Sequence, residues 1–165
     1  MITDSPYETN DLVLSPLKGL TAGVIGAGIM SLIIYLSQPL SKISLVEVFS
    51  TFAKIILPSN LPMSFMQTMG FLFFALSGGI FGLLYALCQH KIPGLGLMFV
   101  GLFYGLILWI FGGLFGGWIL GNSFRAIAHS MPFLISSLVY GVWLASASIW
   151  SMRGRSNITV VLPKD

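Results

Sequence analysis

Residues 95–119 read LGLMFVGLFYGLILWIFGGLFGGWI and contain no charged side chain. The nearest charges on either side are Lys91 and Arg125. A helix of about 20 apolar residues is long enough to cross the hydrocarbon core of a bilayer. We therefore interpret this segment as a membrane span.

The rest of the chain has the same character. Of its 165 residues, 56% are hydrophobic and 8% are charged, and the mean hydropathy is +0.93. Soluble domains carry roughly 25% charged residues, so a soluble globular protein is excluded. The net charge is +3, but the basic residues are scattered, whereas a nucleic-acid surface needs clustered Lys and Arg. We expect no nucleic-acid partner.

Three further uncharged stretches are long enough to span a membrane, and uninterrupted apolar runs lack the alternation of a membrane β-barrel. The predicted fold class is an all-α integral membrane protein, a bundle of four transmembrane helices. The spans are predicted over 17–38, 66–88, 95–119 and 131–151, with polar tails over 1–16 and 152–165.

Residues 44–57 are too short to span and too apolar for a free loop. Ser44 and Glu47 match a capping box, and polar Ser44, Glu47, Thr51 and Lys54 recur at helical spacing. We predict an amphipathic helix that follows the first span, resting at the interface or against the bundle. A packed connector without a role of its own is the alternative.

Glycine spacing is the most specific pattern in the spans. Small residues let membrane helices approach closely, and they recur four or seven positions apart in all four spans. The predicted helix-packing residues are Gly19, Gly23, Gly26, Gly78, Gly82, Gly101, Gly105, Gly112, Gly116, Gly141 and Ala145. The second and fourth spans also align with each other, as do the first and third, which indicates either a tandem hairpin duplication or chance similarity between Gly-rich helices.

Few residues suggest chemistry. Apart from Lys18 at the first entrance, the spans contain no Asp, Glu, Lys or Arg, which disfavours proton pumps and ion-coupled transporters. The single cysteine, Cys88, excludes an intrachain disulfide. His90 and His129 are candidates for binding a pigment or a lipid headgroup, although a solvated interfacial histidine is the simpler reading. We expect no enzyme activity, no metal site and no cofactor, with lipids bound.

Basic residues give the orientation. Lys18, Lys91, Arg153, Arg155 and Lys164 share one side of a four-span topology, against Lys42, Lys54 and Arg125 on the other. Because Lys and Arg are enriched in cytoplasmic loops, both termini are predicted to be cytoplasmic, in a cell (inner) membrane.

This pattern resembles the small four-span inner-membrane proteins of bacteria, particularly those of the Chloroflexi type. The likeness covers residues 17–152 and rests on Lys18-Gly19, Leu84–Ala86, Trp109 and Val139–Gly141. A histidine often precedes the Leu-Val-Tyr-Gly run of that family, and Ser137 stands there in this chain. The resemblance implies a fold and a bacterial membrane location, and no activity.

The expected function is that of a non-catalytic accessory subunit that packs against a larger membrane complex, such as a respiratory or photosynthetic assembly. Surfaces suited to close helix contact, uncharged spans and polar tails able to hold a soluble partner favour it. The alternative is a small oligomeric transporter or channel for a neutral or lipidic solute.

Overall fold

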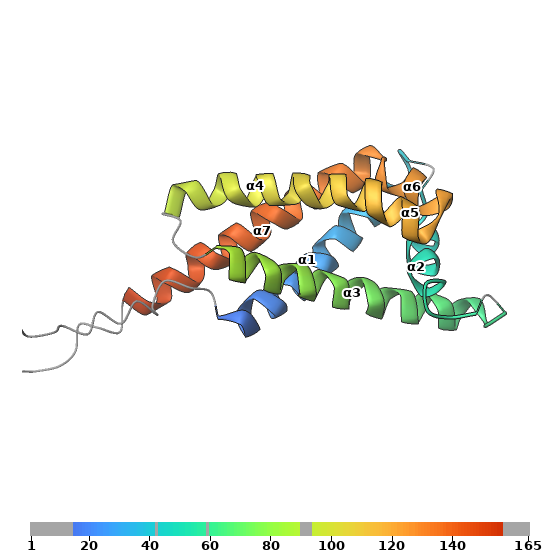
Figure 1. Ribbon diagram of the computed structural model, residues 1–165, viewed down its shortest axis with the longest axis horizontal. Helices are drawn as coiled ribbons and strands as arrows, with labels where there is room; N and C mark the ends of the chain where they lie inside the picture. Colours follow the sequence, from blue (N-terminus) through green and yellow to red (C-terminus); the bar gives the residue numbers. More distant parts are fainter. Residues whose placement is uncertain (1–14, 42, 59, 90–93, 157–165) are drawn as a thin grey trace, which may run out of the picture.

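The computed structural model describes residues 15–41, 43–58, 60–89 and 94–156, and all regular secondary structure in that part is helical (Figure 1). Four of the helices are long and apolar enough to cross a membrane, which confirms the expected all-α membrane bundle. In chain order the elements are α1 (Pro16–Ser37), α2 (Leu45–Ala53), α3 (Met63–Cys88), α4 (Gly94–Phe111), the π-helical segment η1 (Gly112–Gly116), α5 (Gly117–Leu120), α6 (Asn122–Ala128) and α7 (Met131–Ser156).

The helix bounds differ from the expected ones mainly at the ends. α1 begins where expected because Pro16 occupies its first turn and the Ser15 hydroxyl accepts from the Lys18 amide at 3.4 Å. α7 runs on to Ser156, into the segment expected to be a polar tail. A helix satisfies its own backbone hydrogen bonds, so it need not end where the apolar run ends.

α1 and α3 pack through glycines at backbone distance. A methyl group at Gly23 would lie 2.9 Å from Gly82 Cα and would press on the carbonyl oxygen of Gly78. At Gly19 it would lie 2.5 Å from the Ala86 methyl. Such separations leave no room for a Cβ atom, so small residues are what allow these two backbones to meet.

α4 and α7 meet in the same way and at the equivalent positions. A methyl group at Gly101 would lie 2.7 Å from that of Ala145 and would also press on Gly141, just as Gly19 meets Ala86 and Gly82. Gly105 lies against the backbone of Ser137, as Gly23 lies against Gly78. The two hairpins are thus built alike, which supports the tandem-duplication reading.

The hairpins are joined through α1 and α7. Gly26 leaves space for the Tyr140 ring, which would lie 2.7 Å from a methyl group there. The indole Nε1 of Trp143 donates to the Ala22 carbonyl oxygen at 3.0 Å, and the Tyr140 hydroxyl donates to the Gly78 carbonyl oxygen at 2.5 Å. α1 and α7 therefore form the closed side of the bundle.

α2 lies across one end of the bundle, on the same end as α6 and opposite the start of α1 and the end of α7 (Figure 1). It crosses α3 at Gly70, where a side chain would collide with the Phe49 backbone. Thr51, expected on the polar face, is buried, and its hydroxyl donates to the Glu47 carbonyl oxygen at 2.8 Å. That expectation is wrong because a hydroxyl bonded to its own helix can face a packed neighbour.

Candidate functional site

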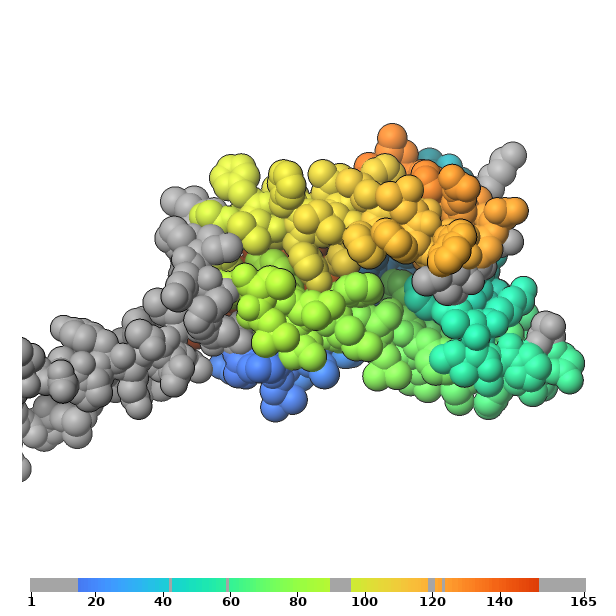
Figure 2. All heavy atoms as spheres, in the orientation of Figure 1, coloured from blue at the N-terminus to red at the C-terminus, as the bar shows by residue number. Residues whose placement is uncertain are grey.

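The other two spans, α3 and α4, leave a cleft between them. Both lie on the same side of the bundle, with α1 and α7 behind them in Figure 1, and Figure 2 looks onto the face that they form. The cleft encloses about 300 Å³ and is open to one side. Among the residues that line it are Met30, Phe74, Phe81, Leu108, Phe115 and Tyr140.

The internal likeness of the two hairpins explains why this side is open. At the offset that aligns Gly19 with Gly101, Leu108 takes the place of Gly26. Phe81 likewise takes the place of Tyr140, and both Leu108 and Phe81 line the cleft. A leucine where the closed side has a glycine keeps α3 and α4 apart, because its side chain occupies the space that a neighbouring backbone would need.

Hydroxyl groups in the cleft are already engaged as donors. Ser77 donates to the Phe74 carbonyl oxygen at 2.7 Å, and Ser137 donates to that of Phe133 at 2.7 Å. Tyr140 donates across to α3, as described above. The remaining lining residues are apolar or glycine. The chemistry of the cleft therefore suits a hydrocarbon guest rather than a polar one.

Aromatic rings close the end of the cleft nearest α2 and α6. Phe52 of α2 lies edge-on to Phe74 of α3 with centroids 5.2 Å apart, and to Phe124 of α6 at 5.4 Å. Phe124 in turn packs edge-on to Phe133 at 6.2 Å. Such aromatic pairs stabilise the packing by more than their buried area alone provides, so this end of the cleft is closed by well-packed rings.

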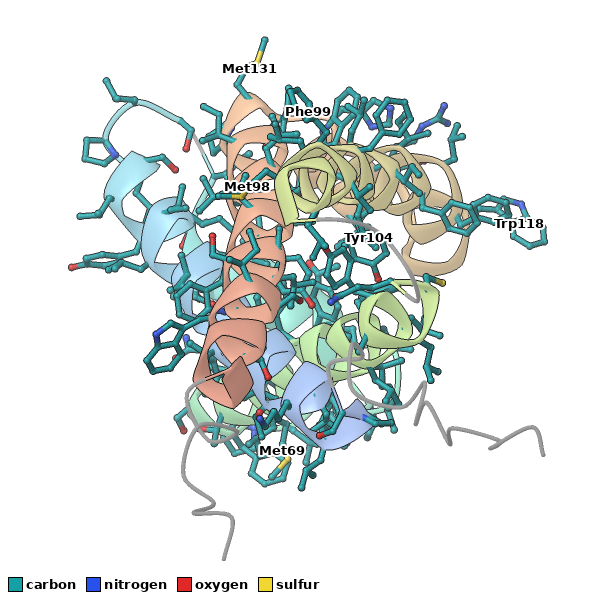
Figure 3. The ribbon with its side chains drawn as sticks, turned by 90° about the vertical axis from the view of Figure 1, so that its left-hand side faces the viewer. Met69, Met98, Phe99, Tyr104, Trp118 and Met131 are labelled. Atoms are coloured by element: carbon teal, nitrogen blue, oxygen red, sulfur yellow. The ribbon has the colours of Figure 1, made fainter. Side chains whose placement is uncertain are left out.

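Tyr104 bridges the cleft toward its other end. Its hydroxyl donates to the Phe81 carbonyl oxygen at 2.6 Å, and its ring packs edge-on to that of Tyr85 with centroids 5.1 Å apart. Figure 3 shows Tyr104 between α4 and α3, pointing into the bundle. The Tyr85 hydroxyl is buried without a hydrogen-bond partner among the described residues.

Gly112 and Gly116 were predicted to be helix-packing residues, and both line this cleft. Both lie in η1, which lines it. A methyl group at Gly112 would only reach ordinary contact with Phe133, at 3.5 Å, while Gly116 leaves room for the Phe124 ring. Gly116 is therefore a helix-packing residue, although its partner is α6 and not a span, whereas the expectation is wrong for Gly112 because the wider π-helical turns rotate it off the stripe that carries Gly101 and Gly105.

Short helix α6 was not expected from the sequence. The chain turns at Gly121, whose φ of +85° is a conformation that residues with a side chain rarely adopt. α6 then buries Phe124, Ile127 and Ala128 against the bundle. The apolar residues among 122–128 are the feature of the sequence from which a short buried helix could have been predicted.

The structure describes one of the two candidate histidines. His90 lies outside the described residues. His129 is exposed, its Nδ1 lies 2.8 Å from the Arg125 carbonyl oxygen, and its ring packs edge-on to Trp109 with centroids 6.4 Å apart. Within the described part of the chain no three His, Cys, Asp or Glu side chains converge on a possible metal position.

Comparison with known proteins gives one match. The model of a family described as a family of unknown function (DUF6789) matches residues 13–156. No curated protein matches the chain, and no solved structure does.

Proposed function

We propose, for a chain that belongs to the DUF6789 family of unknown function, a non-catalytic role in which the α3–α4 cleft binds an apolar, lipid-like molecule within the membrane. The observation that carries the proposal is the cleft itself, an apolar space of about 300 Å³ between two spans that meet only at one end, through Tyr104. Ligand sites in proteins are concave and mostly apolar, and helix bundles commonly hold them between their helices. Carriage of a neutral or lipidic solute is the activity that such a site would serve.

The described residues that line the cleft carry no charge, and each hydroxyl among them already donates to a backbone carbonyl oxygen, which favours a neutral guest. Binding would then rest on burial of hydrocarbon against Phe81, Leu108 and Phe115 and on shape. Because lipid chains surround the protein on all sides, a guest gains little free energy by moving from the lipid into the cleft. It gains more only if it packs against the cleft better than lipid chains do. We therefore infer a guest with a rigid or branched hydrocarbon body rather than a flexible chain.

The test is photo-crosslinking in reconstituted membranes. A lipid carrying a photoactivatable group on its hydrocarbon part is added to the full chain in vesicles, and labelled peptides are mapped by mass spectrometry. We expect labelling of cleft residues that are buried from the surrounding lipid, such as Phe74 and Tyr140. Gly112→Leu should fill the cleft and remove that labelling, because a side chain at Gly112 clears the backbone and extends into the cavity.

The matched control is Gly28→Leu. Gly28 is also a helical glycine of a span, but it is exposed and nothing lies within 4 Å of a methyl group there. This variant should keep the cleft labelling. Labelling confined to outward-facing residues, or cleft labelling unchanged in Gly112→Leu, would rule the proposal out. Uptake of neutral solutes into the same vesicles tests the transport role.

A second candidate function is the accessory subunit expected from the sequence. Most of the small residues behind that expectation pack within this chain, so they do not offer a surface to an outside helix. Gly28 is different, because it leaves an open notch on the outer face of α1. This notch is a place where a helix of a larger membrane complex would fit. The kind of complex, such as a respiratory or photosynthetic assembly, and its place in a cell (inner) membrane with both termini cytoplasmic remain expectations from the sequence.

Co-purification separates the two candidates. If a partner helix occupies the notch, Gly28→Leu should lose the partner during purification from the native membrane in mild detergent, while Gly112→Leu should retain it. A chain that purifies alone from its native membrane contradicts the accessory role.

A further inference from the structure

A second groove lies on the other side of α7, at the end of the bundle where α1 begins. It has a volume of about 770 Å³ and is lined by α1, by α7 and by Met98 of α4. The hydroxyl oxygen of Ser146 on α7 lies 4.0 Å from the sulfur of Met98 on α4, and both residues line the groove. The volume falls within the range of about 300–1,000 Å³ that ligand pockets occupy.

The groove has a polar end and an apolar body. Its polar end carries Lys18, Thr21 and Ser151, and its body is lined by residues such as Ile25 and Ala147. The Lys18 ammonium group donates to the Ser151 hydroxyl oxygen at 3.2 Å, which holds the charge over the groove. Ser151 accepts that bond, so its own proton can be donated to a ligand oxygen.

No acidic residue of the described part of the chain competes for this ammonium group. The described segments contain one carboxylate, Glu47, and it lies on α2 at the opposite end of the bundle (Figure 1). The Thr21 hydroxyl donates to the Lys18 carbonyl oxygen at 3.0 Å, which leaves the Ser151 hydroxyl as the donor beside the ammonium group. A positive charge with a hydroxyl donor beside it is complementary to a phosphate group. The apolar body next to it is complementary to an acyl chain.

Trp150, next to the end of the span Met131–Ser151, places the polar end of the groove at the membrane surface, while Trp143 lies deeper. Trp143 forms part of the groove wall and is fixed by its bond to the Ala22 carbonyl oxygen. Trp150, also part of the wall, is 82% exposed. Tryptophan is enriched at the level of lipid headgroups, so the groove reaches from that level into the hydrocarbon.

We propose that this groove binds one anionic phospholipid, with its phosphate at Lys18 and Ser151 and one acyl chain along Ile25 and Ala147. The site is independent of the α3–α4 cleft and of the function proposed for it. Cytoplasmic leaflets carry a negative surface potential that attracts basic groups beside the membrane, which agrees with the orientation expected from the basic residues.

Lipid retention tests the site. The full chain is placed in nanodiscs with equal amounts of phosphatidylglycerol and phosphatidylcholine, released, and weighed by native mass spectrometry. We expect one phosphatidylglycerol to be retained in preference. Lys18→Gln should lower the ratio of bound phosphatidylglycerol to bound phosphatidylcholine about fivefold, the usual effect of one basic residue near an anionic surface.

Two control variants sharpen the result. Lys18→Arg keeps the charge and should keep the preference. Lys54→Gln removes an exposed lysine at the other end of the bundle and should leave the ratio unchanged. Equal retention of both lipids, or the same ratio before and after Lys18→Gln, overturns the proposal.

Fluorescence of the unmodified chain gives a measurement that needs no folded Lys18 variant. Phosphatidylglycerol brominated on its acyl chain should quench tryptophan fluorescence more strongly than brominated phosphatidylcholine at the same mole fraction. Trp150→Phe should reduce this difference, because it removes a fluorophore from the groove wall. Equal quenching by the two lipids also overturns the proposal.

Discussion

Replacing Gly23 by alanine tests how the first hairpin is held together. The new methyl group would lie 2.9 Å from Gly82 Cα and against the Gly78 carbonyl oxygen, where ordinary contact needs 3.4–4 Å. α1 and α3 must therefore move apart by about 0.5–1 Å, a gap that forfeits roughly a quarter to a half of the dispersion attraction between facing atoms. Overpacking of this kind costs about 1–3 kcal/mol.

Alanine also favours the helix over glycine by about 0.5–1 kcal/mol, which offsets part of that cost. We expect Gly23→Ala to lower the free energy of unfolding by about 1–2 kcal/mol. The measurement is reversible unfolding in mixed micelles with increasing sodium dodecyl sulfate, followed by tryptophan fluorescence and circular dichroism. Gly28→Ala is the matched control, because its methyl group meets no atom within 4 Å and only the helix preference remains. A Gly23→Ala protein as stable as Gly28→Ala would refute the reasoning.

Three more substitutions address single contacts. Tyr140→Phe removes the hydroxyl bond to Gly78 and should lower the free energy of unfolding by about 0.5–1.5 kcal/mol, whereas Tyr35→Phe, at an exposed tyrosine, should be neutral in the same titration. Gly121→Ala forces a side chain into a left-handed backbone conformation and should destabilise the protein by about 1–3 kcal/mol; an unchanged midpoint contradicts the strained turn. Tyr104→Phe breaks the bridge to α3 and should increase photo-labelling of buried Tyr140 by cleft-bound lipid, without changing labelling at outward-facing residues.

The spans were predictable because the properties that define a membrane helix are local to its own stretch of sequence. Length, the absence of charge and four-residue spacing of glycine depend on sequence alone, and Gly23, Gly82, Gly101 and Gly141 lie where such spacing places them. The helix ends were less predictable. The extension of α7 to Ser156 costs the backbone nothing, so no residue signals it.

The cleft was not predicted, because it depends on which pairs of helices fail to meet. Glycine spacing indicates a contact face and does not name the partner. Gly112 shows the difference, since it continues the stripe of Gly105 in sequence but lies in a π-helical turn that faces the cavity. Such a turn depends on packing around Phe124 and Phe133, which come later in the chain.

The likeness of the two hairpins has an evolutionary consequence. A single ancestral hairpin that paired with its own copy would have formed two identical contacts between helices of the two copies, both closed by glycine. If the two halves arose in this way, fusion of the copies into one gene would have let each contact change independently. A glycine kept at position 26 and a leucine at position 108 would be enough to make the two contacts differ. The α1–α7 contact would stay closed, and the α3–α4 side would stay open to a guest molecule.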